Sequence, residues 1–175
     1  MNVTRDGIAV AVGAVVAVLL QVVVAPNIAL FGAMPNFVVA YALLVAIVRP
    51  MAAGPVMPFV LGLVFDLVSG GPVGAMAFLL VLMTFLAARA FAVLDNDTLF
   101  MPLVIFVAAT VLVEALYAAF LLALGFDASA LDVFLYRALP CALYDCVAGL
   151  VLYPIMTRLL SGGSQDRGLR SPRLR

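Results

Sequence analysis

Four charged residues stand within or beside long apolar segments, and their chemistry needs an explanation. Asp66 lies in the stretch GLVFDLVSGGPVGAMAF at residues 62–78, Glu114 and Asp145 each interrupt a further apolar segment, and Arg137 begins the last segment. A charged side chain at the centre of a bilayer costs at least about 2.5–3.5 kcal/mol, so such residues are functional candidates by default. Two buried carboxyl groups could also share a proton, which is a possible start for acid–base chemistry.

The surrounding residues do not complete a reaction centre. The sequence contains no evident nucleophile paired with a base, no glycine loop of the kind that binds phosphate and no histidine at all. Its two cysteines, Cys141 and Cys146, are five positions apart and point about 140° away from each other on a helix, so they should not form a disulfide. We therefore expect no enzyme, no metal and no other cofactor.

The composition predicts that these residues lie in a membrane protein. Hydrophobic residues make up 67% of the 175 positions and charged residues only 10%, whereas a soluble domain is about 45–50% apolar. Too few polar residues remain to cover a soluble surface, so the outside must contact the lipid bilayer. Nine acidic and nine basic residues cancel, and no basic surface interleaved with aromatic residues suggests nucleic acid.

The chain reads as an all-α integral membrane protein with about six transmembrane helices in one compact bundle. A spanning helix needs about 20 apolar residues. The third candidate span, residues 54–68, is short and could be tilted or re-entrant. Turns are expected at Pro26-Asn27, at residues 125–132 and at Ser69-Gly70-Gly71-Pro72, where Pro72 suits the first turn of the fourth helix. The predicted spans are residues 8–24, 29–48, 54–68, 72–93, 99–124 and 137–159.

The arginines predict the orientation, because positively charged residues favour the cytoplasmic side. A cytoplasmic N-terminus leaves Arg137 as the one arginine outside and places both termini in the cytoplasm. We accordingly expect a polytopic domain over residues 1–160 and a disordered basic cytoplasmic tail over residues 161–175. The arginines inside are then Arg5, Arg49, Arg89, Arg158, Arg167, Arg170, Arg173 and Arg175.

Small and polar residues recur at helical spacing, which marks surfaces where helices meet. The outer half of the bundle should contain all four charged residues, with Glu114 and Asp145 at similar depth, so we expect these two acids to meet. They could serve a function or simply hold helices together through hydrogen bonds, and the sequence favours neither. Asp66 is expected to cap the start of the next helix across the SGGP turn. The small and polar residues at helical spacing form four stripes, which are Ala9, Gly13 and Ala17; Gly54, Pro58, Gly62 and Asp66; Thr110, Glu114 and Tyr117; and Arg137, Cys141, Asp145, Gly149 and Tyr153.

Three segments resemble the rod shape-determining protein MreD family. They are PNFVVAYALLVA at residues 35–46, PFVLGLVFDLVSGGPVGAMAFLLVL at 58–82 and RALPCALYDCVAGLVLYPIMTRLL at 137–160. The middle segment looks like the family's signature, a glycine and an aspartate followed by a turn and a glycine in the next helix. Those positions are Gly62, Asp66 and Gly74 here.

The resemblance implies a non-enzymatic scaffold of the cell-elongation machinery in the bacterial inner membrane. Such a scaffold binds MreC and helps to position peptidoglycan synthesis, together with a RodA-type glycosyltransferase, a penicillin-binding transpeptidase and, indirectly, the MreB filament. The candidate structural and partner-interface residues are Gly62, Asp66, Gly70, Gly71, Pro72, Gly74, Glu114, Arg137, Asp145 and Gly149.

The family's fold is also similar to that of the substrate-binding S components of ECF vitamin transporters. This kinship provides the alternative function, in which the outer charged residues hold a polar ligand. Against that alternative, the sequence lacks tryptophan and histidine and has no long polar outer loops.

Overall fold

The computed structural model describes residues 3–30, 33–49, 54–94, 100–125 and 129–161. Within these ranges every regular element is helical, apart from an isolated bridge between Leu30 and Ala33. The predicted tail lies outside the described residues from position 162 onward. The elements are α1 Val3–Leu19, η1 Leu20–Val24, η2 Ala25–Ile28, α2 Phe37–Val48, α4 Val56–Ser69, α5 Ala75–Val93, α6 Met101–Ala123, α7 Ala130–Val133, η3 Phe134–Ala138 and α8 Leu139–Ser161.

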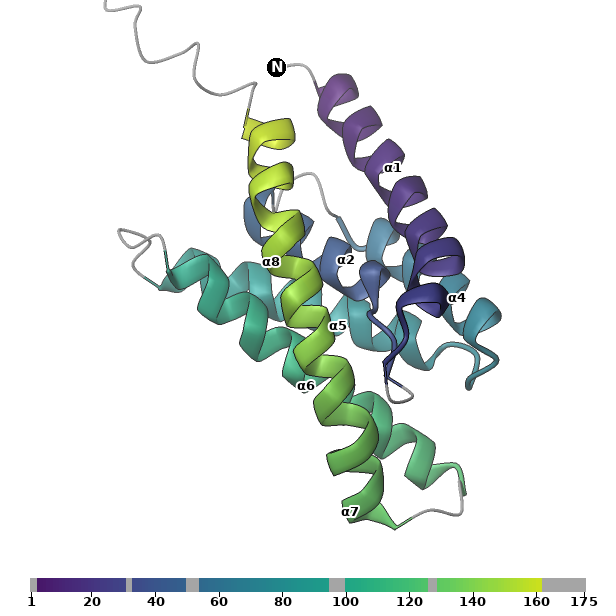
Figure 1. The fold of residues 1–175 in the computed structure, drawn as a ribbon. Coiled ribbons are helices and arrows are strands. Elements are labelled where there is room, and N and C mark those ends of the chain that lie inside the picture. Colours follow the sequence, from purple (N-terminus) through teal and green to yellow (C-terminus); the bar gives the residue numbers. More distant parts are fainter. Residues whose placement is uncertain (1–2, 31–32, 50–53, 95–99, 126–128, 162–175) are drawn as a thin grey trace, which may run out of the picture.

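The central element is α2, a helix of 12 residues. Every residue from Val38 to Ile47 is buried, and α1, α4, α5, α6 and α8 all contact this helix. A helix that is apolar on every face is stable where protein surrounds it on every side. The FVVAYALLVAIV run of α2 is therefore the core of the bundle rather than a helix facing lipid (Figure 1).

Among the described residues, four helical segments are long and apolar enough to cross a membrane, and two apolar helices are shorter. The long ones cover Gly7–Ile28, Ala75–Val93, Met101–Ala123 and Ala130–Arg158. The 12 residues of α2 and the 14 of α4 extend about 18 and 21 Å, less than the roughly 30 Å of hydrocarbon. The all-α membrane fold is confirmed, with two of its six helices shorter than a full span.

The second predicted span, residues 29–48, was wrong in its first half. The helix begins only at Phe37, because Asn36 adopts a non-helical conformation and its side chain accepts a hydrogen bond from Val39 N at 3.1 Å. Asparagine at this position is a common helix start. Ala29, Leu30 and Ala33–Asn36, which precede the helix, are not helical.

Three predicted boundaries also differ from the structure. Pro26 and Asn27 do not break the first span, because they lie in the 3-10 turn η2 that continues α1 and η1; a proline is tolerated at the start of such a turn. The expected turn at residues 125–132 is shorter, since helix begins again at Ala130. Pro72 precedes α5 instead of lying in its first turn, because Gly74 takes a left-handed conformation immediately before Ala75.

The start of α1 and the end of α8 lie at the same end of the molecule (Figure 1). Arg49 directly follows α2, and Arg158 lies in the last turn of α8. Both helices run toward the end that holds the start of α1. We call the opposite end, which contains residues 29–30 and 33–36, the turn at 70–74 and α7, the distal end. The arrangement fits the predicted topology, while the side of the membrane that each end faces stays a prediction.

Candidate functional site

Asp66, near the end of α4, caps the start of α5. Its Oδ2 accepts hydrogen bonds from Gly74 N at 2.8 Å and Ala77 N at 3.3 Å, and its Oδ1 accepts one from Met76 N at 3.1 Å. The side chain is 1% exposed. A carboxylate at a helix N-terminus satisfies amides that have no partner within the helix and opposes the positive end of the helix dipole. The expected capping role of Asp66 agrees with these contacts, and its role at a partner interface stays a prediction.

The turn between α4 and α5 depends on glycine. Gly70 and Gly74 have φ angles of +68° and +95°, in the left-handed region that residues with a Cβ rarely adopt. Gly71 lies so close to the Tyr117 hydroxyl of α6 that a Cβ atom there would collide with it. At the end of the same turn, Pro72 O accepts a hydrogen bond from Ala75 N at 3.2 Å. The predicted SGGP turn therefore packs against a third helix as well as joining two.

Two helical glycines allow close helix packing. A Cβ at Gly62 of α4 would lie 2.6 Å from Ala77 N and 2.7 Å from Met76 O on the first turn of α5. A Cβ at Gly149 of α8 would collide with the ring of Phe106, which is fully buried on α6. Both glycines thus serve contacts inside this chain, so neither presents a free surface to a partner.

Asp145 of α8 caps α2 as Asp66 caps α5. Its Oδ1 accepts a hydrogen bond from Asn36 N at 2.5 Å, and Gln21 Oε1 accepts one from Phe37 N at 2.8 Å. The sequence interpretation missed Asn36 and Gln21. A proline and an asparagine directly before an apolar run are a sequence signal for Asn36, whereas no local pattern points to Gln21.

The structure brings Glu114 and Asp145 together. The two carboxyl groups lie near enough to influence each other, and the Asn36 side chain lies near Glu114. Thr110, one turn before Glu114, donates to Phe106 O at 2.9 Å and so is satisfied within its own helix. Two carboxyl groups can form a hydrogen bond with each other only when one of them is protonated.

A cavity of about 750 Å³ opens at the distal end. Glu114 is 8% exposed and forms part of its buried wall, while Arg137 is exposed at its rim. The four charged residues expected in one cluster thus divide, since neither Asp66 nor Asp145 lines the cavity. The lining residues are Gln21, Pro26, Met34, Asn36, Phe65, Val68, Ser69, Gly70, Gly71, Met76, Glu114, Tyr117, Leu121, Tyr136, Arg137 and Cys141.

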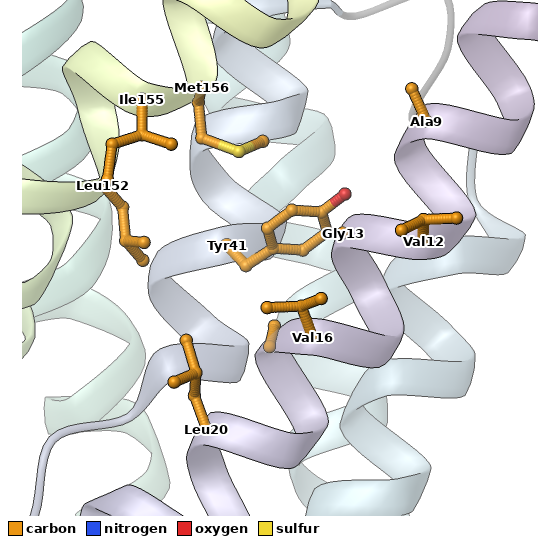
Figure 2. Close-up of a pocket in the computed structure, with 10 residues that line it drawn as sticks. Ala9, Val12, Gly13, Val16, Leu20, Tyr41, Leu152, Ile155 and Met156 are labelled. Carbon is orange, nitrogen blue, oxygen red and sulfur yellow. The ribbon is translucent and has the colours of Figure 1, made fainter.

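A second, apolar groove of about 360 Å³ separates α1 from α8 (Figure 2). The Tyr41 ring of α2 lies at its base and points toward Gly13, whose Cβ would come within 2.8 Å of the ring. The Tyr41 hydroxyl donates to Val10 O at 2.7 Å, so its hydrogen bond is made inside the protein. The lining residues are Ala9, Val12, Gly13, Val16, Ala17, Leu20, Tyr41, Leu152, Ile155 and Met156.

Comparison with family models decides the identity. The model described as rod shape-determining protein MreD matches residues 5–162, which is nearly the whole described chain. The chain belongs to the MreD family. The resemblance inferred from the sequence is thereby confirmed, and the MreD family implies a role in rod shape determination. No curated protein and no solved structure matches the chain significantly.

In this member of the MreD family, buried polar side chains connect neighbouring helices. Asp145 of α8 bonds to the start of α2, and Asp66 of α4 bonds to the start of α5. Glu114, which lies near Asp145, lines the distal cavity. Among the residues that the structure describes, no group of three or more histidine, cysteine or acidic residues could hold a metal ion. Two hollows in the described part of the chain, one polar and one apolar, are able to receive another molecule.

Proposed function

We propose that this MreD-family protein is a non-enzymatic scaffold of the cell-elongation machinery in the bacterial inner membrane. In this proposal it binds MreC and helps to position peptidoglycan synthesis. Membership of a shape-determining family supports the setting. The observation that carries the binding role is the apolar groove between α1 and α8, which is a surface suited to one transmembrane helix of a partner.

The occupant of this groove must be apolar. Val12, Val16 and Leu20 form one wall, while Leu152 and Ile155 form the other. The one polar group at the base, the Tyr41 hydroxyl, already donates to Val10 O, so a partner needs no polar atom to satisfy it. An apolar transmembrane helix meets these conditions.

The length of the groove suits a helix packed along it. Its wall of α1 residues and Leu20 of η1 extends from Ala9 to Leu20, about 16 Å along the axis or three turns. Gly13 and Ala17 keep the base free of large side chains on the α1 side. Small residues at such a site permit close approach of helices, which stabilises their association within a bilayer.

The partner with the required chemistry is MreC, a periplasmic protein with a membrane anchor. The RodA-type glycosyltransferase and the penicillin-binding transpeptidase would join the same assembly through MreC or other faces of the bundle. The MreB filament would be reached indirectly on the cytoplasmic side. The protein itself then contributes position rather than a reaction.

Site-specific photo-crosslinking in the native membrane tests this proposal. A photoreactive residue at Val16, which lines the groove, is expected to capture MreC, whereas one at Val15, 61% exposed on another side of α1, is not. Equal capture at both positions, or none at either, would contradict the groove assignment.

A mild-detergent pulldown of the tagged protein tests the assembly as a whole. Recovery of MreC and the RodA-type synthase is expected. Recovery of a pair of transporter ATPases and their membrane coupling subunit would instead favour the S-component alternative and overturn the scaffold.

A further inference from the structure

The distal cavity presents charges of opposite sign at two depths. Glu114 lies on its buried wall, 8% exposed, and Arg137 lies at its exposed rim. Both residues line the same cavity, whose volume is about 750 Å³. That size falls within the roughly 300–1,000 Å³ typical of small-molecule sites.

The buried charge lacks a complete set of partners. Asp145 is 0% exposed, and no N–H or O–H group among the described residues donates to its Oδ2 atom. The neighbouring Glu114 can donate a hydrogen bond to this oxygen only when its own carboxyl group is protonated. Two adjacent carboxylates in a low-dielectric interior cannot both stay ionised without a positive partner. Either a proton or a cation must therefore join the pair.

We propose that the distal cavity binds a zwitterion, with an ammonium group at Glu114, which lines the cavity, and an anionic group at Arg137. The ammonium group bonds to the Glu114 carboxylate, and its positive charge offsets the buried Asp145 behind that side chain. The arginine guanidinium at the rim offers several N–H donors to a phosphate or carboxylate. Both charges of the ligand thus meet their complements inside one cavity.

The remaining walls define the rest of the ligand. Phe65, Val68 and Leu121 present apolar surface, which suits methylene groups or an acyl chain. Tyr117, Ser69 and Tyr136 add hydroxyl groups able to bond a phosphate or carboxyl oxygen. Two sources share this chemistry, namely the headgroup of a phosphatidylethanolamine-type lipid and a free small zwitterion.

The test uses full-length protein in nanodiscs of phosphatidylglycerol, which lacks an amine. O-phosphoethanolamine is titrated calorimetrically to represent the free zwitterion. Native mass spectrometry then measures retention of added phosphatidylethanolamine relative to phosphatidylglycerol. Binding of the first probe alone identifies a free zwitterion as the source, and selective retention of the second identifies the lipid headgroup; either supports the proposal.

Two variants remove the charges with little change in shape. The double variant Glu114→Gln/Asp145→Asn is neutral but keeps amide hydrogen bonds within the pair and to Asn36 N. Arg137→Gln changes an exposed side chain that the fold does not need. Each is expected to weaken binding of the effective probe by about tenfold or more, as loss of a charged hydrogen bond does.

Matched controls are Asp132→Asn and Arg158→Gln, which alter exposed charges outside the cavity and should bind like the wild type. Absence of binding by both probes to wild-type protein would overturn the proposal. So would unchanged binding in Arg137→Gln, whose fold is not at risk. Capture of MreC at the α1–α8 groove is measured separately, so failure here leaves the scaffold proposal standing.

Discussion

Asp145 Oδ1 accepts a hydrogen bond from the main-chain amide of Asn36, 109 positions earlier in the chain, at a distance of 2.5 Å. This contact joins α8 to the first residue before α2, the most enclosed helix of the bundle. Asp66 accepts hydrogen bonds from three amides at the start of α5, 8 to 11 positions later. Both short-range and long-range capping therefore use a buried aspartate on a neighbouring helix, and both caps lie toward the distal end.

Replacing Asp66 separates the value of its charge from that of its hydrogen bonds. Asp66→Asn keeps one acceptor oxygen and should lower the free energy of unfolding by about 1–2 kcal/mol. Asp66→Leu leaves the buried amides of Gly74, Met76 and Ala77 without this partner and should lower it by more than about 3 kcal/mol. Unfolding in detergent, with exposed Asp132→Asn as the control, measures both. Equal, wild-type stability of the two Asp66 variants would refute the capping role.

The carboxyl pair predicts a contrast at Glu114. Glu114→Gln should unfold close to wild type, because its amide can donate to Asp145 Oδ2 as a protonated carboxyl does. Glu114→Leu leaves that enclosed oxygen without a donor and should destabilise by about 1–3 kcal/mol. Thermal unfolding of both variants in the same detergent distinguishes them. Identical unfolding midpoints for the glutamine and leucine variants would mean that a hydrogen bond from residue 114 to Asp145 does not contribute to stability.

Gly62 tests the backbone packing between α4 and α5. Gly62→Ala adds a methyl group against Ala77 N and Met76 O, both main-chain atoms that cannot move aside, so overpacking should cost about 1–3 kcal/mol. Gly7→Ala on α1 meets nothing within 4 Å and should be neutral or slightly stabilising, since alanine favours helix. Chemical unfolding of the two variants provides the comparison. Equal stability would show that α4 and α5 are farther apart than described.

The groove predicts a steric block to partner binding. Ile155→Trp fills part of the wall contributed by α8 and should reduce recovery of MreC by about tenfold, as loss of a packed interface anchor does. Val151→Trp lies one turn earlier, 61% exposed and outside the groove, and should leave recovery unchanged. Quantitative pulldown with equal expression of both variants measures the difference. Reduced recovery with Val151→Trp alone would place the partner on another face.

Local sequence was sufficient for features that depend on neighbouring residues. The apolar content of the chain required a membrane, because a soluble surface needs more polar atoms than this sequence contains. The Asp66 cap was predictable since the acid and the amides it binds are separated by one turn motif, SGGP. The glycine and aspartate of that same stretch also carried the family resemblance.

Tertiary structure decided what depends on distant residues. Residues 29–48 and 8–24 are similarly apolar, and sequence alone could not show that α2 is short and enclosed by five helices while most of α1 is exposed. The same limit applied to the four charged residues. Their positions along the helices predicted one cluster, but the packing of α8 against α2 and α6 places Asp66 and Asp145 at helix starts and leaves Glu114 and Arg137 in the cavity. Hydrophobicity determines that a segment leaves water, whereas only the packing of side chains determines which helix it meets there.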